Sequence, residues 1–381
     1  MPKKMVALIF VFKICTIITI FLAYRFLYFD SEAHRVNFLA HPEEGITLQS
    51  AFETWDAQHY LYLSEKGYPK NRSSDAFFPL FPWVIRAFTR VLHSSFISGL
   101  LVSNLCSFGA YCYFFLLVRM LVNARIASLS LLALLVFPTN FYCSLIYSES
   151  LFMLLLFAFF YYLYSHRYLW AALFSFLLPL TRGVGVLIVF PFLTYHILSQ
   201  LHDPDKFDSQ TKISARFQMA YLLAPLIGFE CYLHWIYRAT GNPWRGFLAQ
   251  QYFVSQRNVL NLFHPETLLH NLFSWSTGPD GYTNLVLDRL FFLLFAALLY
   301  SIYKKTDIVL FSYSLLFGLT PLLGSFMSYT RLLLPVFPIY IVFALAFDDP
   351  KRRFLRFALL GLSFSLQTFL TVLQALNFWV A

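Results

Sequence analysis

The sequence predicts an all-α integral membrane protein that crosses the bilayer many times. Of its 381 residues, 59% are hydrophobic and 12% are charged, whereas a soluble domain carries about 25% charged residues. Apolar stretches about as long as the hydrocarbon core is thick recur along the whole chain. The net charge of +9 comes mostly from Lys and Arg in the short loops between these stretches, where basic residues set membrane orientation. We therefore interpret the charge as topology rather than as a nucleic-acid site.

Eleven apolar stretches are predicted to span the membrane. The first starts like a signal peptide, but no small-residue cleavage site follows it, so we expect an uncleaved span. The fifth and sixth are shorter than a crossing helix needs and meet at Arg182, which suggests two helices converging on a cavity below the outer surface. The expected spans are 5–29, 97–118, 126–145, 148–165, 168–180, 184–198, 217–237, 285–303, 307–326, 332–347 and 354–379.

The basic loops predict the orientation of the chain. With Lys3 and Lys4 in the cytoplasm, alternation of the spans places every basic loop on the cytoplasmic side. Two long segments, 30–96 and 238–284, then face the other side, and we name them the first and second outer loops. The basic residues expected on the cytoplasmic side are Arg119, Arg125, His166, Arg167, Lys206, Lys212, Arg216, Lys304, Lys305, Lys351, Arg352, Arg353 and Arg356.

The first outer loop is predicted to be structured. Residues 49–66 carry apolar side chains near helical spacing, as expected for one amphipathic helix. Pro79 and Pro82 interrupt an apolar run at 77–92 that is too short to cross, so we expect an interfacial or re-entrant segment there. Neither an internal repeat nor a separate soluble domain is evident, and we interpret residues 1–381 as one membrane-embedded domain.

Four ionisable residues collect where apolar segments meet the outer surface, namely Asp56, Glu149, Arg182 and Arg331. Because a charge beside hydrocarbon is costly, such residues often mark a site. A carboxylate at a cavity mouth suits a general base that takes a proton from a hydroxyl, which favours Asp56. The arginine fork binds phosphate bidentately, so Arg182 and Arg331 are candidates for a donor phosphate. The alternative is that these two arginines pair with Asp56 or Glu149.

His59 lies one helical turn after Asp56 and has two interpretations. It could orient the carboxylate or the acceptor, or it could be a packed, aromatic-like residue. No metal site is expected, because the five cysteines lie in or beside apolar stretches without ligand spacing. The outer loops also lack a DxD pair of acids that would hold a metal-bound nucleotide sugar. This pattern favours a lipid-linked sugar as the donor.

Five short motifs stand out along the chain. They are WDAQHY at 55–60 with Gly67 and Tyr68 after it, FFPLFP at 77–82, YSESLF at 147–152, TRG at 181–183 and YTR at 329–331. The first four cover most of residues 50–190, and the fifth supplies an arginine in the C-terminal half. In type and order, these motifs resemble those of the PIG-V-type mannosyltransferase family.

The resemblance implies a GT-C-type fold. It also implies transfer of a sugar, usually mannose, from a polyprenyl-phosphate donor to a glycolipid or glycan acceptor, with inversion of the anomeric centre. Asp56 would be the base, and the two arginines would bind the donor phosphate. The compact outer loops favour a prokaryotic relative. The membrane would be the plasma membrane in a prokaryote and that of the endoplasmic reticulum in a eukaryote, and an accessory membrane subunit is left open. The acceptor pocket would be shaped by Trp55, His59 and Glu149.

Two alternatives stay open. The donor could carry another lipid-linked pentose or hexose, since nothing in the sequence identifies the sugar. A lipid or ion transporter would place ionisable residues near the bilayer midplane, often in two repeated halves, and the two halves here show no repeat. Lys13 and Arg25 lie inside the first expected span, and we expect both to reach an interface. Residues 71–73 also fit an N-glycosylation acceptor.

Overall fold

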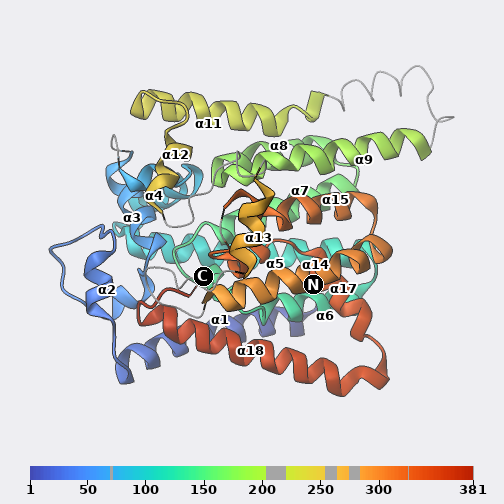
Figure 1. Ribbon diagram of the computed structural model, residues 1–381, viewed down its shortest axis with the longest axis horizontal. Helices are drawn as coiled ribbons and strands as arrows, with labels where there is room; N and C mark the ends of the chain where they lie inside the picture. The colour runs from blue at the N-terminus through green and yellow to red at the C-terminus, as the bar shows by residue number, and fades with distance from the viewer. Residues whose placement is uncertain (69–71, 203–219, 254–263, 274–283, 325, 381) are drawn as a thin grey trace.

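The computed structural model describes residues 1–68, 72–202, 220–253, 264–273, 284–324 and 326–380. Every regular element within these ranges is a helix, as the sequence predicts. The long helices run side by side along the long axis of the molecule, and short helices gather at one end (Figure 1). The short helices at this end are α2 (Ser31–Val36), α3 (Asp56–Lys66), α4 (Leu80–Leu92) and α12 (Arg245–Leu248).

Each of the eleven predicted stretches contains a helix. Within the described ranges, five segments are long and apolar enough to cross a membrane, and five further apolar helices have 10–17 residues. At a rise of about 1.5 Å per residue, the shorter ones fall below the roughly 30 Å of the hydrocarbon core. The number of crossings therefore stays a prediction. The helices are α1 (Lys3–Phe26), α5 (Ser95–Leu121), α6 (Ala124–Leu135), α7 (Glu149–Tyr164), α8 (Tyr168–Thr181), α9 (Val189–His202), α11 (Ala224–Thr240), α14 (Asn284–Lys305), α15 (Ile308–Gly318), α17 (Pro338–Phe347) and α18 (Arg353–Ala375).

Three predicted spans are wrong in extent. Helix α6 ends at Leu135 rather than at 145, and α15 ends at Gly318 rather than at 326. The stretch predicted at 332–347 is divided between α16 (Tyr329–Leu333) and α17. A proline follows or separates the helices in each case, and proline has no backbone N–H to continue the α-helical hydrogen bonds. These prolines are Pro138, Pro321 and Pro335.

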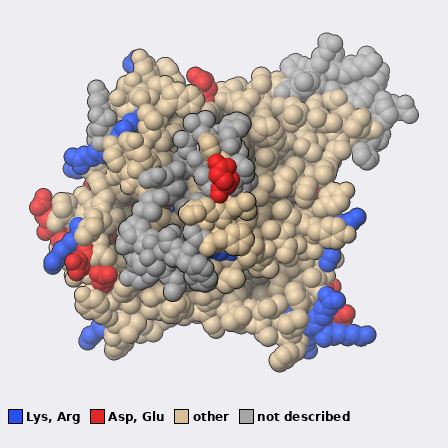
Figure 2. Space-filling model, in the orientation of Figure 1, with Lys and Arg blue, Asp and Glu red and all other residues tan. Residues whose placement is uncertain are grey.

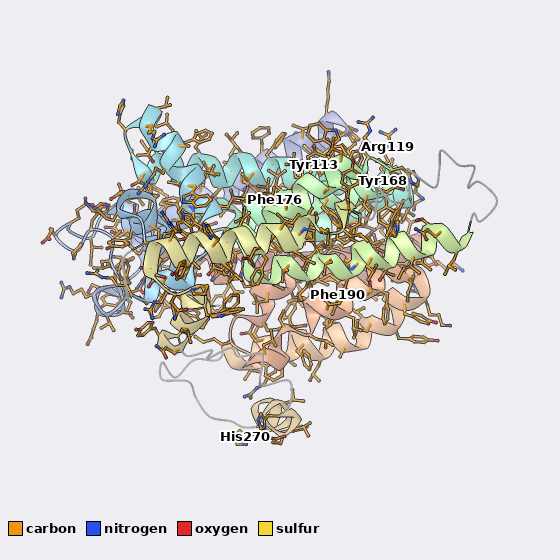
Figure 3. The ribbon with its side chains drawn as sticks, turned by 90° about the horizontal axis from the view of Figure 1, so that it is seen from above. Tyr113, Arg119, Tyr168, Phe176, Phe190 and His270 are labelled. Carbon is orange, nitrogen blue, oxygen red and sulfur yellow. The ribbon has the colours of Figure 1, made fainter. Side chains whose placement is uncertain are left out.

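The loops predicted to be cytoplasmic lie together at one end of the bundle. Arg125 pairs with Asp348 at 2.6 Å, and the Tyr164 hydroxyl donates to Asp307 at 2.6 Å. Figure 3 shows Arg119 near the same end. On the face shown in Figure 2, most charged side chains lie toward the two ends, and few lie between them apart from an acidic patch near the middle. This distribution is the one expected of a multi-pass membrane protein.

The two outer loops pack on each other at the opposite end. Arg245 of the second outer loop donates from Nε to Asp75 of the first at 2.8 Å, and both side chains are buried. A Cβ atom at Gly246 would lie 1.9 Å from the Tyr232 hydroxyl, so a larger residue at position 246 would clash with the Tyr232 side chain. The second outer loop also contains α13 (Pro265–Phe273), which Figure 3 shows at the edge of the molecule with His270 labelled. The sequence did not predict this contact between the loops.

Lys13 does not reach an interface, so that expectation is wrong. Its ammonium group donates to the Ser107 hydroxyl at 2.6 Å, to the Cys143 carbonyl at 2.7 Å and to the Ser144 hydroxyl at 3.1 Å. The last two belong to the 3₁₀ segment Asn140–Ser144 between α6 and α7. The backbone leaves the α-helical path there and offers two polar groups, which together with the Ser107 hydroxyl of α5 satisfy all three ammonium protons inside the bundle.

Candidate active site

The backbone at Trp55 fixes the start of helix α3 at Asp56. Trp55 has φ 53° and ψ −117°, a conformation that residues other than glycine rarely adopt. The helix predicted at 49–66 is therefore two elements, a 3₁₀ turn at Leu48–Phe52 and α3. Asp56 is the first residue of α3, where the helix dipole favours a negative charge. The Trp55 indole packs edge-on against Trp379 at 4.9 Å, and its Nε1 is buried without a hydrogen-bond partner.

The four ionisable residues singled out in the sequence form one chain of ion pairs. Arg331 binds Asp56 through Nη1 at 2.7 Å and Glu149 through Nε at 2.5 Å. Arg182 binds the same Glu149 oxygen through Nη1 at 2.6 Å. The order along the chain is thus Asp56, Arg331, Glu149 and Arg182. The charges of the two carboxylates and the two guanidinium groups balance each other. The observed contacts are those of the alternative in which the two arginines pair with Asp56 or Glu149.

The two ends of the ion-pair chain are more exposed to solvent than its middle. The side chains of Asp56 and Arg182 are 16% and 23% exposed, whereas those of Arg331 and Glu149 are 7% and 2% exposed. A molecule arriving from outside can therefore touch the two terminal groups, a carboxylate and a guanidinium. The two inner groups are held by protein on all sides and fix the positions of the outer ones.

Two tyrosine rings enclose the Arg331 guanidinium. Its central carbon lies 4.7 Å from the ring centroids of both Tyr142 and Tyr147. A cation on the face of an aromatic ring is stabilised, most strongly where water is excluded. Tyr147 belongs to the YSESLF motif, but Tyr142 precedes that motif and sequence reasoning missed it.

Asp288 in α14 holds the backbone next to Arg331, and sequence reasoning missed it too. Its Oδ1 accepts hydrogen bonds from the Thr330 amide and from the Thr330 hydroxyl, both at 2.7 Å. The side chain is buried. A signal was present, because an acid inside an expected membrane span is costly and usually has a function or a partner.

His59 is packed between aromatic rings. Its imidazole stacks on Phe38 at 4.5 Å and on Phe77 at 4.6 Å, and Nδ1 lies 2.9 Å from the Ser74 hydroxyl. Burial lowers the pKa of His59 to about 4, although the charge of Asp56 acts in the opposite direction. His59 is therefore neutral near pH 7. These contacts support the packed alternative, and a role for His59 toward the acceptor stays a prediction.

Glu53 is a buried acid three residues before Asp56. Its carboxylate accepts a hydrogen bond from Gln49 at 2.9 Å, and burial raises its pKa from 4.5 to about 7. It lines a polar pocket within the first outer loop, to which Gln58 and Ser50 also contribute. Glu53 is thus expected to exchange a proton near neutral pH.

Glu53→Gln is expected to flatten the pH dependence of thermal stability between pH 4.5 and about 7. Because the pKa of Glu53 is higher in the folded state than its ordinary value, the neutral carboxyl contributes stability below pH 4.5 that is lost as the pH rises through about 7. Thermal unfolding in detergent at a series of pH values measures this slope. Glu43→Gln, at an exposed position of the same loop, is the control. Equal slopes for Glu53→Gln and wild type would contradict the prediction.

No group of three or more His, Cys, Asp or Glu side chains within the described ranges is placed to hold a metal ion. Asn71, the first residue of the glycosylation triplet, lies outside the described residues.

A helical bundle with membrane-length helices and a charged cluster at one end defines a multi-pass membrane protein with a polar site near one surface. The family model described as "Mannosyltransferase (PIG-V)" matches residues 8–236, and the chain belongs to this family. The family resemblance found in the sequence is therefore confirmed. The matched part includes Asp56, Glu149 and Arg182 but not Arg331. No curated protein matches the chain.

Among solved structures, the chain is similar to the archaeal oligosaccharyltransferase AglB from Archaeoglobus fulgidus in complex with an inhibitory peptide and a dolichol-phosphate. The TM-score is 0.51 at 12% identity, and the match covers 99% of this chain and 56% of that one. The apo form of the Archaeoglobus fulgidus oligosaccharyltransferase matches with a TM-score of 0.48 at 12% identity, over 96% of this chain and 56% of that one. The chain thus spans about half the length of these enzymes. The likeness to AglB shows the GT-C-type fold.

Proposed function

We propose that this protein transfers mannose from a polyprenyl-phosphate donor to a hydroxyl of a glycolipid or glycan acceptor, at the non-cytoplasmic face of the membrane. The observation that carries the proposal is the partly exposed carboxylate of Asp56 at the end of a buried ion-pair chain. Family membership and the shared fold support a lipid-linked sugar donor. The membrane is that of the endoplasmic reticulum in a eukaryote and the plasma membrane in a prokaryote.

Asp56 is assigned as the general base. Arg331 engages Oδ2, and we assign Oδ1 to the proton of the acceptor hydroxyl. As this proton leaves, the acceptor oxygen attacks the anomeric carbon and the bond from that carbon to the phosphate oxygen breaks. Attack from the side opposite the leaving group inverts the anomeric centre. The products are the glycosylated acceptor and the polyprenyl phosphate, and the proton stays on Asp56 until water removes it.

Arg182 is assigned to the donor phosphate. It is the more exposed of the two arginines, and only its Nη1 is engaged by Glu149. The rest of its guanidinium group is suited to two parallel hydrogen bonds with phosphate oxygens. Arg331 is nearly buried and bound to both acids, so we assign it to holding Asp56 and Glu149 in place. Trp55 is assigned to the acceptor pocket, because it directly precedes Asp56.

Arg182→Ala is expected to lower kcat/KM for the donor by about tenfold to 100-fold, as for a lost charge-assisted hydrogen bond. The KM for the acceptor should change little. Initial rates at varied donor concentration in lipid vesicles measure the effect. Arg238→Ala, at an exposed position of α11, is the matched control. A donor kcat/KM for Arg182→Ala equal to that of the control would remove Arg182 from the phosphate site.

A second candidate keeps the mechanism and changes the donor sugar. Hydroxyl recognition decides between mannose and another lipid-linked hexose or pentose. The test compares transfer from polyprenyl-phosphate mannose, glucose and arabinose by the same protein in the same vesicles. Transfer from mannose alone supports the proposal, and preferred transfer from another sugar replaces it with the second candidate.

A further inference from the structure

Gln374 in α18 joins three segments that surround the ion-pair chain. Its Nε2 donates to the Thr54 hydroxyl at 2.8 Å and to the Tyr147 hydroxyl at 3.0 Å. Its Oε1 accepts from the Tyr142 hydroxyl at 3.0 Å. The side chain is 1% exposed. A primary amide has two donor hydrogens, so both are used here.

Two of these partners are the rings that enclose Arg331. Gln374 therefore fixes the hydroxyl ends of Tyr142 and Tyr147 while their faces contact the guanidinium. The Tyr147 hydroxyl in turn donates to the Thr54 carbonyl at 2.7 Å. Gln374, Tyr147 and Thr54 thus form a closed ring of hydrogen bonds at the base of the site.

The third partner stands next to the unusual backbone of Trp55. A residue other than glycine keeps a positive φ only where its surroundings enforce it. Thr54 is fully buried and held through both its hydroxyl and its carbonyl. The Trp55 ring packs on Trp379, five residues beyond Gln374. The C-terminal end of the chain thus holds the two residues whose backbone sets the direction of Asp56.

We propose that Gln374 is a positioning residue that aligns the carboxylate of Asp56 with Arg331. Gln374 is too deeply buried to touch substrate, so it acts through Thr54 and the two tyrosines. This inference rests on the proposed function of Asp56 as the base. Gln374 lies outside the residues matched by the family model.

The test compares Gln374→Met with Gln367→Met. Gln367 lies on the same helix, is 5% exposed, and donates from Nε2 to the Leu135 and Phe137 carbonyls at 2.9 and 3.1 Å. Both variants lose buried hydrogen bonds of one amide, but only Gln374 contacts the site. Gln374→Met is expected to lower kcat by about tenfold or more, with the donor KM within about twofold of wild type, as for displacement of a reacting group. Gln367→Met is expected to keep the wild-type kcat.

A second variant tests the same link without changing α18. Thr54→Val removes the hydroxyl that accepts from Gln374, and it should also lower kcat while leaving the donor KM near wild type. The double variant should lose less than the product of the two single losses, because both changes remove one shared hydrogen bond. Thr54→Val keeps the inference testable if Gln374→Met does not fold.

Three results would overturn the inference. The first is a wild-type kcat in both folded Gln374→Met and folded Thr54→Val. The second is an equal loss of kcat in Gln367→Met and Gln374→Met. The third is a loss that appears only as a higher donor KM. A wild-type protein without any transfer would instead refute the proposed function, and this inference with it, so the two failures are distinguishable.

Discussion

Asp56→Asn is expected to lower mannosyl transfer by about 100-fold or more, the contribution typical of a general base. Asparagine keeps the shape of the side chain and an oxygen that can accept from Arg331, which lies 2.7 Å from Asp56 Oδ2. It cannot take the proton of an acceptor hydroxyl. The measurement is transfer of labelled mannose by purified protein in lipid vesicles, with thermal unfolding to show that the variant is folded.

Asp348→Asn is the matched control for this loss. Asp348 also pairs with an arginine, Arg125, but at the opposite end of the bundle. Its substitution should leave the transfer rate near that of wild type. Folded Asp56→Asn with a rate within about threefold of wild type would remove Asp56 from the base role, since a general base contributes far more than that.

Glu149→Ala is expected to have the largest effect on stability. The Glu149 side chain is 2% exposed and its Oε1 binds both Arg331 and Arg182. Its removal leaves a buried guanidinium group without this partner, and breaking a buried pair in this way costs about 3–5 kcal/mol. We expect a large fall in the yield of folded protein and in Tm. Size-exclusion profiles and thermal unfolding in one detergent measure both.

Asp348→Ala serves as the reference for an ion pair that is not buried. The contact between Asp348 and Arg125 is 2.6 Å long, the same as that between Glu149 and Arg182, but the two side chains are 34% and 65% exposed, respectively. Exposed pairs contribute about 0–1 kcal/mol, so the variant should be nearly as stable as wild type. Equal destabilisation of Glu149→Ala and Asp348→Ala would show that burial of the central acid does not hold the site together.

Hydropathy was sufficient to place the helices, because length and apolarity decide where a bilayer-spanning helix can form. The same pattern could not place their ends. In the predicted span at 126–145 the composition stays apolar after Leu135, but the chain leaves the helix before Pro138. Composition thus located the element, and the helix ended where Pro138 offers no backbone N–H to continue it.

The site was predictable where an ionisable residue stands beside hydrocarbon. This argument selected Asp56, Glu149, Arg182 and Arg331, and the structure brings these four together. The pairing between these four residues depends on how helices distant in sequence pack together. The sequence therefore left open whether the arginines pair with the acids or bind a phosphate.

Three other residues were missed or misread for physical reasons. Gln374 carries no charge, and a polar amide in an apolar span has no signal that separates a structural from a positioning role. The conformation of Trp55 depends on contacts with α18 and the chain after it. Lys13 was expected at an interface, because its partners become available only where the segment Asn140–Ser144 leaves the α-helical path.

The most direct test of the central claim is transfer of labelled mannose by the purified wild-type protein in lipid vesicles that contain mixed glycolipid acceptors. Polyprenyl-phosphate mannose and GDP-mannose are supplied in separate reactions. The account predicts a labelled glycolipid from polyprenyl-phosphate mannose, none from GDP-mannose, and a rate with Asp56→Asn that is lower by about 100-fold or more. A labelled product from GDP-mannose, or one that forms equally well with Asp56→Asn, would contradict it.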